Sequence, residues 1–183
     1  MFRQAREFGP VVLIPLAWGF VAAAHLRIVS TSTLFIAHVV MATLLAGFAV
    51  TGRSDMREGV LHTWWLVIVS GFVATVVGAM GFRVGSSGSL FQGIALFGWM
   101  VLPAVGFVDT GRRVSKRAWI YFGSATACVL GAAVYALGLF VSLPVGPVFG
   151  LGLVGGGQTL AILDAAFGYE VNDSVKRATD ERV

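Results

Sequence analysis

The sequence has one cysteine, three histidines and little charge, with charged residues making up 12% of its 183 residues. A single cysteine, Cys128, excludes an internal disulfide and any metal site built from several thiolates. Cys128 lies within an apolar run, where we expect its thiol to behave as a small hydrophobic group. The sequence also lacks a phosphate-binding glycine loop, a zinc signature and a dinucleotide fingerprint, which leaves no motif for those enzyme classes.

Charged residues make up 12% of the chain, whereas they make up about 25% of a soluble domain. Apolar residues make up 57% of the chain. A chain this short cannot bury so much apolar surface away from water. The apolar residues form six runs, each near the ~20 residues that a helix needs to cross a bilayer. The runs are Gly9–Val29, Thr33–Val50, Val60–Phe82, Leu90–Val108, Ala118–Phe140 and Val148–Phe167.

These runs predict an all-α bundle of six transmembrane helices in one domain, residues 1–169, followed by a polar tail, residues 170–183. The tail mixes acidic and basic residues, and either continues the sixth helix or frays. The segments between the runs, such as Asp109–Arg117, are short. Short connections predict that successive helices pack side by side in antiparallel directions.

Positive charge alternates from one side of the predicted bundle to the other. With the N-terminus inside, only Arg27 and Arg83 are outside, and eleven basic residues are inside. Such a bias predicts cytoplasmic termini in a cell membrane. We interpret the net charge of +4 as a topology signal and an attraction to anionic lipid, and expect no nucleic-acid partner. The inner residues are Arg3, Arg6, Arg53, Arg57, Arg112, Arg113, Lys116, Arg117, Lys176, Arg177 and Arg182.

Two segments of similar sequence suggest an internal repeat. Phe48–Arg53 ends the second run and Phe107–Arg112 ends the fourth, and both contain Thr-Gly-Arg. The similarity predicts that runs two–three and four–five are duplicated hairpins, as in some transporters. The alternative is that Thr-Gly-Arg suits any helix end at an interface. The corresponding glycines are Gly71 with Gly131 and Gly78 with Gly138.

Residues that weaken helices occur in the fourth and sixth runs. Pro103 is expected to kink its helix. The sixth run holds three consecutive glycines, which allow either close helix packing or a helix break near the membrane centre, where transporters bind substrate. We expect Trp18 and Trp99, which lie deep in their runs, to fill helix contacts. The glycines are Gly155, Gly156 and Gly157.

Few polar side chains fall within the runs, and each is costly there, at ~2.5–3.5 kcal/mol for a central charge. Together they predict a pathway for a proton or a small substrate, because a histidine near its ~6.5 pKa changes charge readily. The alternative is that the shallow ones are interface residues and that Asp164 pairs with a basic residue. The candidates are His25, His38, Gln158, Asp164, His62 and Asp109.

Two of these histidines suggest a different chemistry. His25 and His38 lie in consecutive runs near the same predicted surface. Two imidazoles from adjacent helices are suitable axial ligands for the iron of a haem b. Under this alternative the protein is the membrane anchor of a larger redox complex.

Gly85–Ser86–Ser87–Gly88–Ser89–Leu90–Phe91 resembles the Gly-x-Ser-Gly element of rhomboid proteases, intramembrane serine enzymes with six helices. The resemblance implies a nucleophile at Ser87 and an oxyanion-stabilising role for His38. The family's general base is a histidine on the sixth helix, whereas this chain has no histidine after His62. Without a base the serine is not activated, so the resemblance implies a non-catalytic relative.

Taken together, the sequence predicts a transporter or channel for a small solute or ion, with proton coupling as an option, or the membrane subunit of one. The alternative is an anchor subunit of a larger complex. Neither reading requires catalysis, and no catalytic residue or cofactor is assigned beyond the haem alternative. Because the chain is small for an independent transporter, we expect a homo-oligomer or partner membrane subunits in the bilayer.

Overall fold

The computed structural model describes the backbone of residues 2–180 and the side chains of residues 11–167. Within this part, all regular secondary structure is helical, with six α-helices and one short 3-10 helix, η1 (Gly85–Ser87). The predicted all-α fold is therefore confirmed. The helices are α1 (Phe2–His25), α2 (Thr31–Thr51), α3 (Gly59–Met80), α4 (Gly88–Arg113), α5 (Ala118–Phe140) and α6 (Gly146–Asp180).

Five segments are long and apolar enough to cross a membrane, judged by length and composition: Thr31–Thr51, Gly59–Met80, Gly85–Arg113, Ala118–Phe140 and Gly146–Phe167. The chain is thus a helical membrane protein. A helix suits this environment because it satisfies its own backbone hydrogen bonds where no water is present. In α1, the apolar segment Val11–His25 is shorter, so a sixth crossing stays a prediction.

Three helix boundaries differ from those predicted from hydropathy. α1 ends at His25, before the predicted Val29, because Arg27 adopts a positive φ of 58° that turns the chain. α4 continues to Arg113 and α6 to Asp180. Polar residues end an apolar run without ending a helix, because arginine, lysine and glutamate are good helix formers. The predicted loop Asp109–Arg117 is therefore reduced to residues 114–117.

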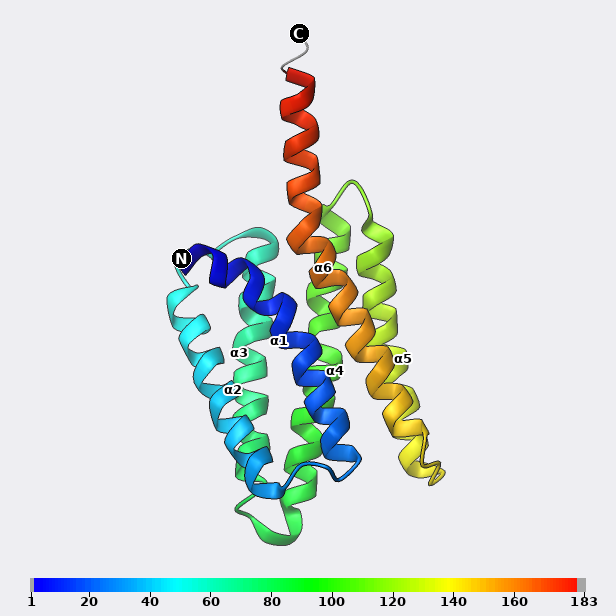
Figure 1. The fold of residues 1–183 in the computed structure, drawn as a ribbon. Helices are drawn as coiled ribbons and strands as arrows, with labels where there is room; N and C mark the ends of the chain where they lie inside the picture. The colour runs from blue at the N-terminus through cyan, green and yellow to red at the C-terminus, as the bar shows by residue number, and fades with distance from the viewer. Residues whose placement is uncertain (1, 181–183) are drawn as a thin grey trace.

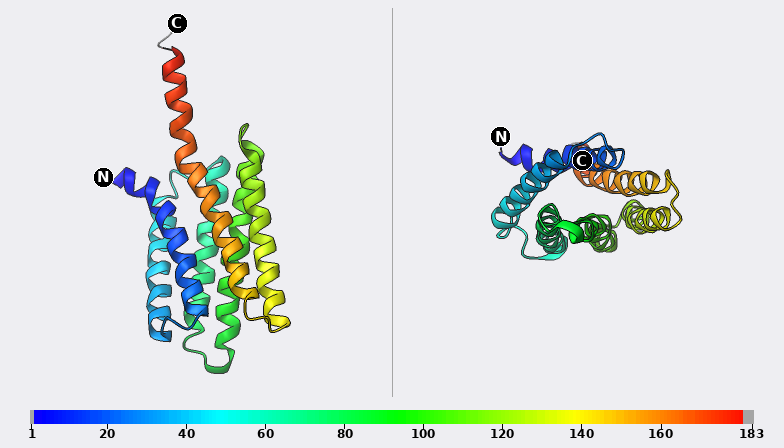
Figure 2. Two further views of the ribbon diagram at one scale, coloured as in Figure 1. Left: turned by 45° about the vertical axis from the view of Figure 1, so that its right-hand side comes forward. Right: turned by 90° about the horizontal axis from the view of Figure 1, so that it is seen from below.

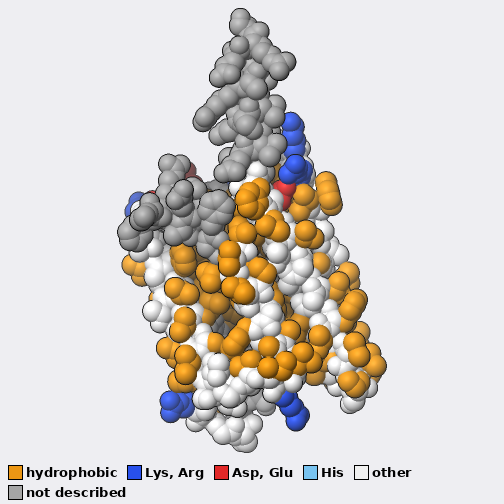
Figure 3. Space-filling model, in the orientation of Figure 1, with side chains coloured by type: hydrophobic (Ala, Val, Ile, Leu, Met, Phe, Trp, Pro, Cys, Tyr) orange, Lys and Arg blue, Asp and Glu red, His pale blue; other side chains and the backbone are white. Residues whose placement is uncertain are grey.

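The bundle has two distinct ends (Figure 1). α1 begins and α6 ends at the same end, and the connections 52–58 and 114–117 lie there too. The basic residues of those connections thus share one end, while Arg27 and Arg83 belong to the opposite end. In Figure 3, blue side chains lie at both ends of the visible face, and its middle is largely apolar. Which end faces the cytoplasm stays a prediction.

Helix packing follows the chain from α2 to α6, but α1 is an exception. α2 packs on α3, α3 on α4, α4 on α5 and α5 on α6, as short connections predict. α1 packs instead along α6, and makes little contact with α2. Figure 2 shows the result from below, with α1 and α6 on one side and α3, α4 and α5 on the other. The expectation of side-by-side packing was therefore wrong for α1 and α2.

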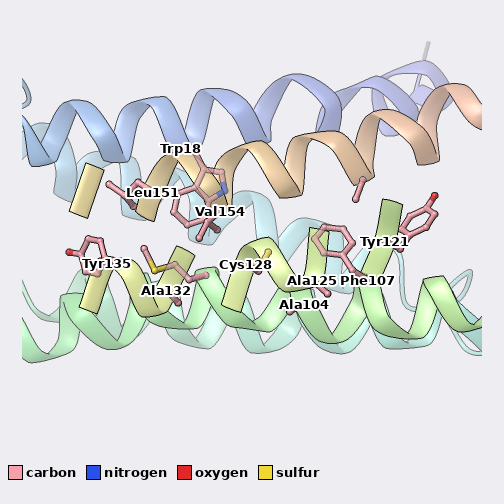
Figure 4. Close-up of a cluster of buried hydrophobic side chains, with 12 residues drawn as sticks. Trp18, Ala104, Phe107, Tyr121, Ala125, Cys128, Ala132, Tyr135, Leu151 and Val154 are labelled. Atoms are coloured by element: carbon pink, nitrogen blue, oxygen red, sulfur yellow. The ribbon is translucent and has the colours of Figure 1, made fainter. Parts of the chain in front are cut away.

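The core lies between these two groups of helices (Figure 4). Its fully buried side chains include Met100, Phe107, Leu151 and Val154. Glycines bring α5 and α6 into backbone contact: a Cβ on Gly131 would lie 2.7 Å from the backbone oxygen of Gly150 on α6. Such close approach replaces the hydrophobic driving force that is missing in lipid.

The glycines of the suggested repeat occupy similar surroundings. Gly71 and Gly78 of α3 face Trp99 and Ala95 of α4, while Gly131 and Gly138 of α5 face α6. In each pair, the glycines therefore contact the next helix along the chain. The Thr-Gly-Arg segments differ, because Gly52 caps α2 whereas Gly111 lies inside α4. The duplication stays a prediction.

Candidate functional site

Gln158 lies near the middle of the apolar part of α6, Gly146–Phe167, and is 3% exposed. Both ends of its amide are hydrogen-bonded to other helices. Trp18 Nε1 of α1 donates to Gln158 Oε1 at 3.0 Å, and Gln158 Nε2 donates to the backbone oxygen of Trp99 of α4 at 3.0 Å. One neutral side chain thus joins three helices in the membrane interior.

Pro103 explains why the oxygen of Trp99 is available. In an α-helix each carbonyl accepts from the N–H four residues later, and four residues after Trp99 is Pro103, which has no N–H. α4 nevertheless runs unbroken through Pro103. A carbonyl left without a donor in lipid is costly, and a neighbouring helix commonly satisfies it. Gln158 supplies the missing donor.

The hydrogen bonds continue from Trp99 into α3. Trp99 Nε1 donates to Thr75 Oγ1 at 2.9 Å, and Thr75 Oγ1 donates to the backbone oxygen of Gly71 at 2.8 Å. Cys128 of α5 is fully buried, in the same buried cluster as Trp18. We call the residues of α1, α3, α4, α5 and α6 that meet here the central polar cluster: Trp18, Thr75, Trp99, Cys128 and Gln158.

The three consecutive glycines of α6 flank this cluster, and the helix is continuous through them. A Cβ on Gly155 would lie 2.9 Å from Trp18 Cβ, and one on Gly157 would lie 2.8 Å from Ala127 Cβ. A Cβ on Gly156 would meet nothing within 4 Å. Of the two alternatives drawn from the sequence, the structure shows close packing for Gly155 and Gly157, and no break in α6.

His25 lies at the end of α1 and bonds to α5. Its Nε2 is 2.7 Å from Tyr135 Oη, and the two rings meet edge to face with centroids 5.3 Å apart. Phe97 of α4 packs edge-on against the same tyrosine, with centroids 5.5 Å apart. Among the described side chains of α1, residues 11–25, His25 and Trp18 therefore make the hydrogen bonds to other helices.

His38 of α2 has separate surroundings. Its Nδ1 is 2.9 Å from the backbone oxygen of Leu34, and its ring packs edge-on against Phe82 with centroids 5.2 Å apart. The ring also lies over Gly78 of α3. His38 thus contacts α3, whereas His25 contacts α5, and a haem between these histidines would require both to leave their present partners.

Asp109 and His62 lie at the end of the bundle where α1 begins. Thr63 Oγ1 of α3 donates to Asp109 Oδ2 at 2.8 Å, and Arg113 Nε donates to Asp109 Oδ1 at 3.0 Å. Asp109 therefore ties α4 to α3. His62 is exposed, and its ring stacks on Trp65 with centroids 6.1 Å apart. Neither contacts Gln158.

Asp164 pairs with a basic residue, as one of the alternatives expected. Arg117 Nη1 donates to Asp164 Oδ1 at 2.8 Å. Arg117 is the N-cap of α5 and has a positive φ of 60°, an uncommon conformation for a residue with a side chain. The pair joins the start of α5 to α6 about a turn and a half from Gln158.

The sequence identified Gln158 and Pro103 separately and left Trp18 and Trp99 as packing residues. The structure shows that both tryptophans pack and also donate hydrogen bonds. Thr75 and Cys128 were missed as members of the cluster. The available signal was the proline, because it predicts that the carbonyl of Trp99 needs a donor from another helix.

Ser87, the residue of the rhomboid resemblance, is the last residue of η1, next to the start of α4, and is exposed. Among the described residues, no group of three or more His, Cys, Asp or Glu side chains is arranged to hold a metal ion. Comparison of the chain with protein-family models, with curated proteins and with solved structures finds no match.

Proposed function

We propose that the chain, alone or as a subunit, moves a small solute or ion across a membrane, and that the central polar cluster is where the solute is held. The observation that carries the proposal is the bond from Gln158 to the carbonyl that Pro103 frees on Trp99. Broken helical hydrogen bonds near the membrane centre supply the substrate-binding carbonyls of many transporters.

The chemistry of the site suits a solute that offers hydrogen-bond donors or a positive charge. If Trp18 withdraws its N–H and Gln158 turns, two oxygens become free acceptors, Gln158 Oε1 and the oxygen of Trp99. Both are neutral carbonyl oxygens, and such groups replace the water around small cations and polar solutes in selective pores. The described part of the cluster carries no charged side chain, so the site neither traps nor repels an ion strongly.

α1 is the element best suited to open the site. It packs along α6 and makes little contact with α2, and the polar attachments of its described part, residues 11–25, are Trp18 and His25. Moving α1 away from α6 breaks one hydrogen bond at Gln158 and uncovers Gly155. Such a motion exposes the cluster while α3, α4, α5 and α6 keep their mutual contacts.

Flux through vesicles tests the proposal. The purified chain is reconstituted into phosphatidylcholine vesicles, and dissipation of a proton gradient, dissipation of a potassium gradient and swelling in urea and in glycerol are each measured. We expect at least one flux to exceed that of empty vesicles, and Gln158→Leu to reduce that flux at least tenfold.

Thr126→Val is the matched control, because the Thr126 hydroxyl is exposed on α5 and bonds to Phe122 of its own helix. It should leave the flux unchanged. Wild-type vesicles that match empty ones with all four probes, or a Gln158→Leu variant that matches wild type, would contradict the proposal.

A second candidate, a membrane anchor or scaffold subunit, is favoured by α2. This helix packs mainly on α3, and of its residues Leu45 is the buried one. A helix with so much apolar surface left over can receive a helix of another subunit. Mass spectrometry of the gently extracted protein would then show a partner subunit in fixed ratio, or a haem b adduct under the His25–His38 alternative.

A further inference from the structure

A groove of about 510 Å³ lies between α2 and α3. Apart from Thr43 and Arg83 its lining is apolar, and it includes the small residues Ala42, Ala46 and Ala79. These alanines are too small to fill the space between the two helices. The hydroxyl of Thr43 is bonded to the oxygen of Val39 on its own helix.

The groove is as long as one leaflet is deep. On α2 it reaches from Phe35 to Ala46, and on α3 from Phe72 to Arg83. Eleven residues of helix rise about 16 Å, and half of a ~30 Å hydrocarbon core is about 15 Å. A single acyl chain from the leaflet on the Arg83 side therefore matches the groove from the interface to the bilayer midplane.

Arg83 gives the groove a charged end. Its guanidinium lies over the ring of Phe35, with Cζ 4.9 Å from the ring centroid, and its side chain is exposed. Among the side chains that the structure describes, no carboxylate pairs with Arg83. The cation–π contact holds the guanidinium at the mouth of the groove, where its N–H groups can bond to a phosphate.

The geometry points to a bound phospholipid with an anionic headgroup, its acyl chain in the groove between α2 and α3 and its phosphate on Arg83. The apolar length and the single cation at the interface end together match the two parts of such a molecule. The site is independent of the central polar cluster.

Native mass spectrometry of the full chain tests this site. The protein is reconstituted in vesicles of phosphatidylcholine and phosphatidylglycerol in equal amounts, extracted in mild detergent and examined for retained lipid. We expect one phosphatidylglycerol per chain in preference to phosphatidylcholine. Arg83→Gln should reduce its retention at least fivefold, and Thr43→Phe should do the same by filling the groove.

Two matched variants separate this site from general lipid adhesion. Arg27→Gln removes the other cation of the same end, and Thr126→Phe adds a ring at another exposed threonine that bonds to its own helix. Both should retain phosphatidylglycerol as wild type does. The assignment is overturned if Arg83→Gln and Thr43→Phe retain lipid normally, if the control variants lose it equally, or if both lipids are retained alike. A dimer without bound lipid would also overturn it.

Discussion

At the scale of single residues, the structure links two features that are separate in the sequence, Pro103 in the fourth apolar run and Gln158 in the sixth. Pro103 removes an N–H from α4, and Gln158 restores a donor to the orphaned carbonyl of Trp99. Both residues were recognisable in the sequence as unusual within apolar runs. Their pairing was not, because 55 positions separate them and nothing local specifies which face of α6 meets α4.

Gln158→Leu should lower the free energy of unfolding by about 1–3 kcal/mol, since it leaves the indole N–H of Trp18 and the oxygen of Trp99 without partners. Unfolding in mixed micelles with increasing dodecyl sulfate measures this loss. Thr126→Val, which removes a hydroxyl bonded within its own helix, should stay within about 0.5 kcal/mol of wild type.

Pro103→Ala tests the pairing itself. Alanine at this position supplies an N–H for the oxygen of Trp99, so Gln158→Leu should cost about 0.5–1.5 kcal/mol less in the Pro103→Ala background than in wild type. The double-mutant cycle is measured in the same micelle titration. Strictly additive losses would show that Gln158 does not replace the proline's missing donor.

At the scale of helices, hydropathy predicted where each one lies but not where it ends. The apolar runs end at Val108 and Phe167, whereas α4 and α6 continue through Asp109–Arg113 and beyond Phe167 as polar helix. The glycines of α6 show a similar limit. The composition of α6 is compatible with both close packing and a helix break. Close packing at Gly155 depends on Trp18 of α1, and the sequence of α6 does not specify where Trp18 lies.

Adjacent glycines of α6 should therefore respond oppositely to the same substitution. Gly155→Ala places a methyl group 2.9 Å from Trp18 Cβ and should lower the free energy of unfolding by about 1–3 kcal/mol. Gly156→Ala meets nothing within 4 Å and should be neutral or stabilise by up to about 1 kcal/mol. The measurement is the thermal unfolding of both variants in one detergent, and similar shifts would contradict the packing of α1 on α6.

At the scale of the whole molecule, the sequence predicted the helical membrane fold but not the order of packing. Short connections correctly predicted neighbours from α2 to α6, because a few residues cannot reach past an adjacent helix. They did not predict that α1 packs along α6, far away in sequence, where Gly155 leaves room for Trp18. This placement assembles the central polar cluster from five helices. It also makes α1 the helix whose movement most readily exposes that cluster.

The reactivity of Cys128 in the membrane tests most directly whether this cluster opens. Cys128 is buried, and a buried thiol is inert toward reagents that attack thiolates in water. Vesicles are treated with 2-aminoethyl methanethiosulfonate, and the added mass is followed over time. A Cys128→Ala/Ser54→Cys variant, whose thiol lies at an exposed position, shows that the reagent is active.

If the cluster opens as proposed, folded wild-type protein is labelled slowly but completely. Trp18→Phe, which removes the indole N–H that bonds to Gln158, then raises the rate roughly threefold or more. The opposite result is that neither wild type nor Trp18→Phe is labelled until it is unfolded, while the Ser54→Cys variant reacts fully. In that case the cluster is a permanent structural contact between helices and the transport proposal is wrong.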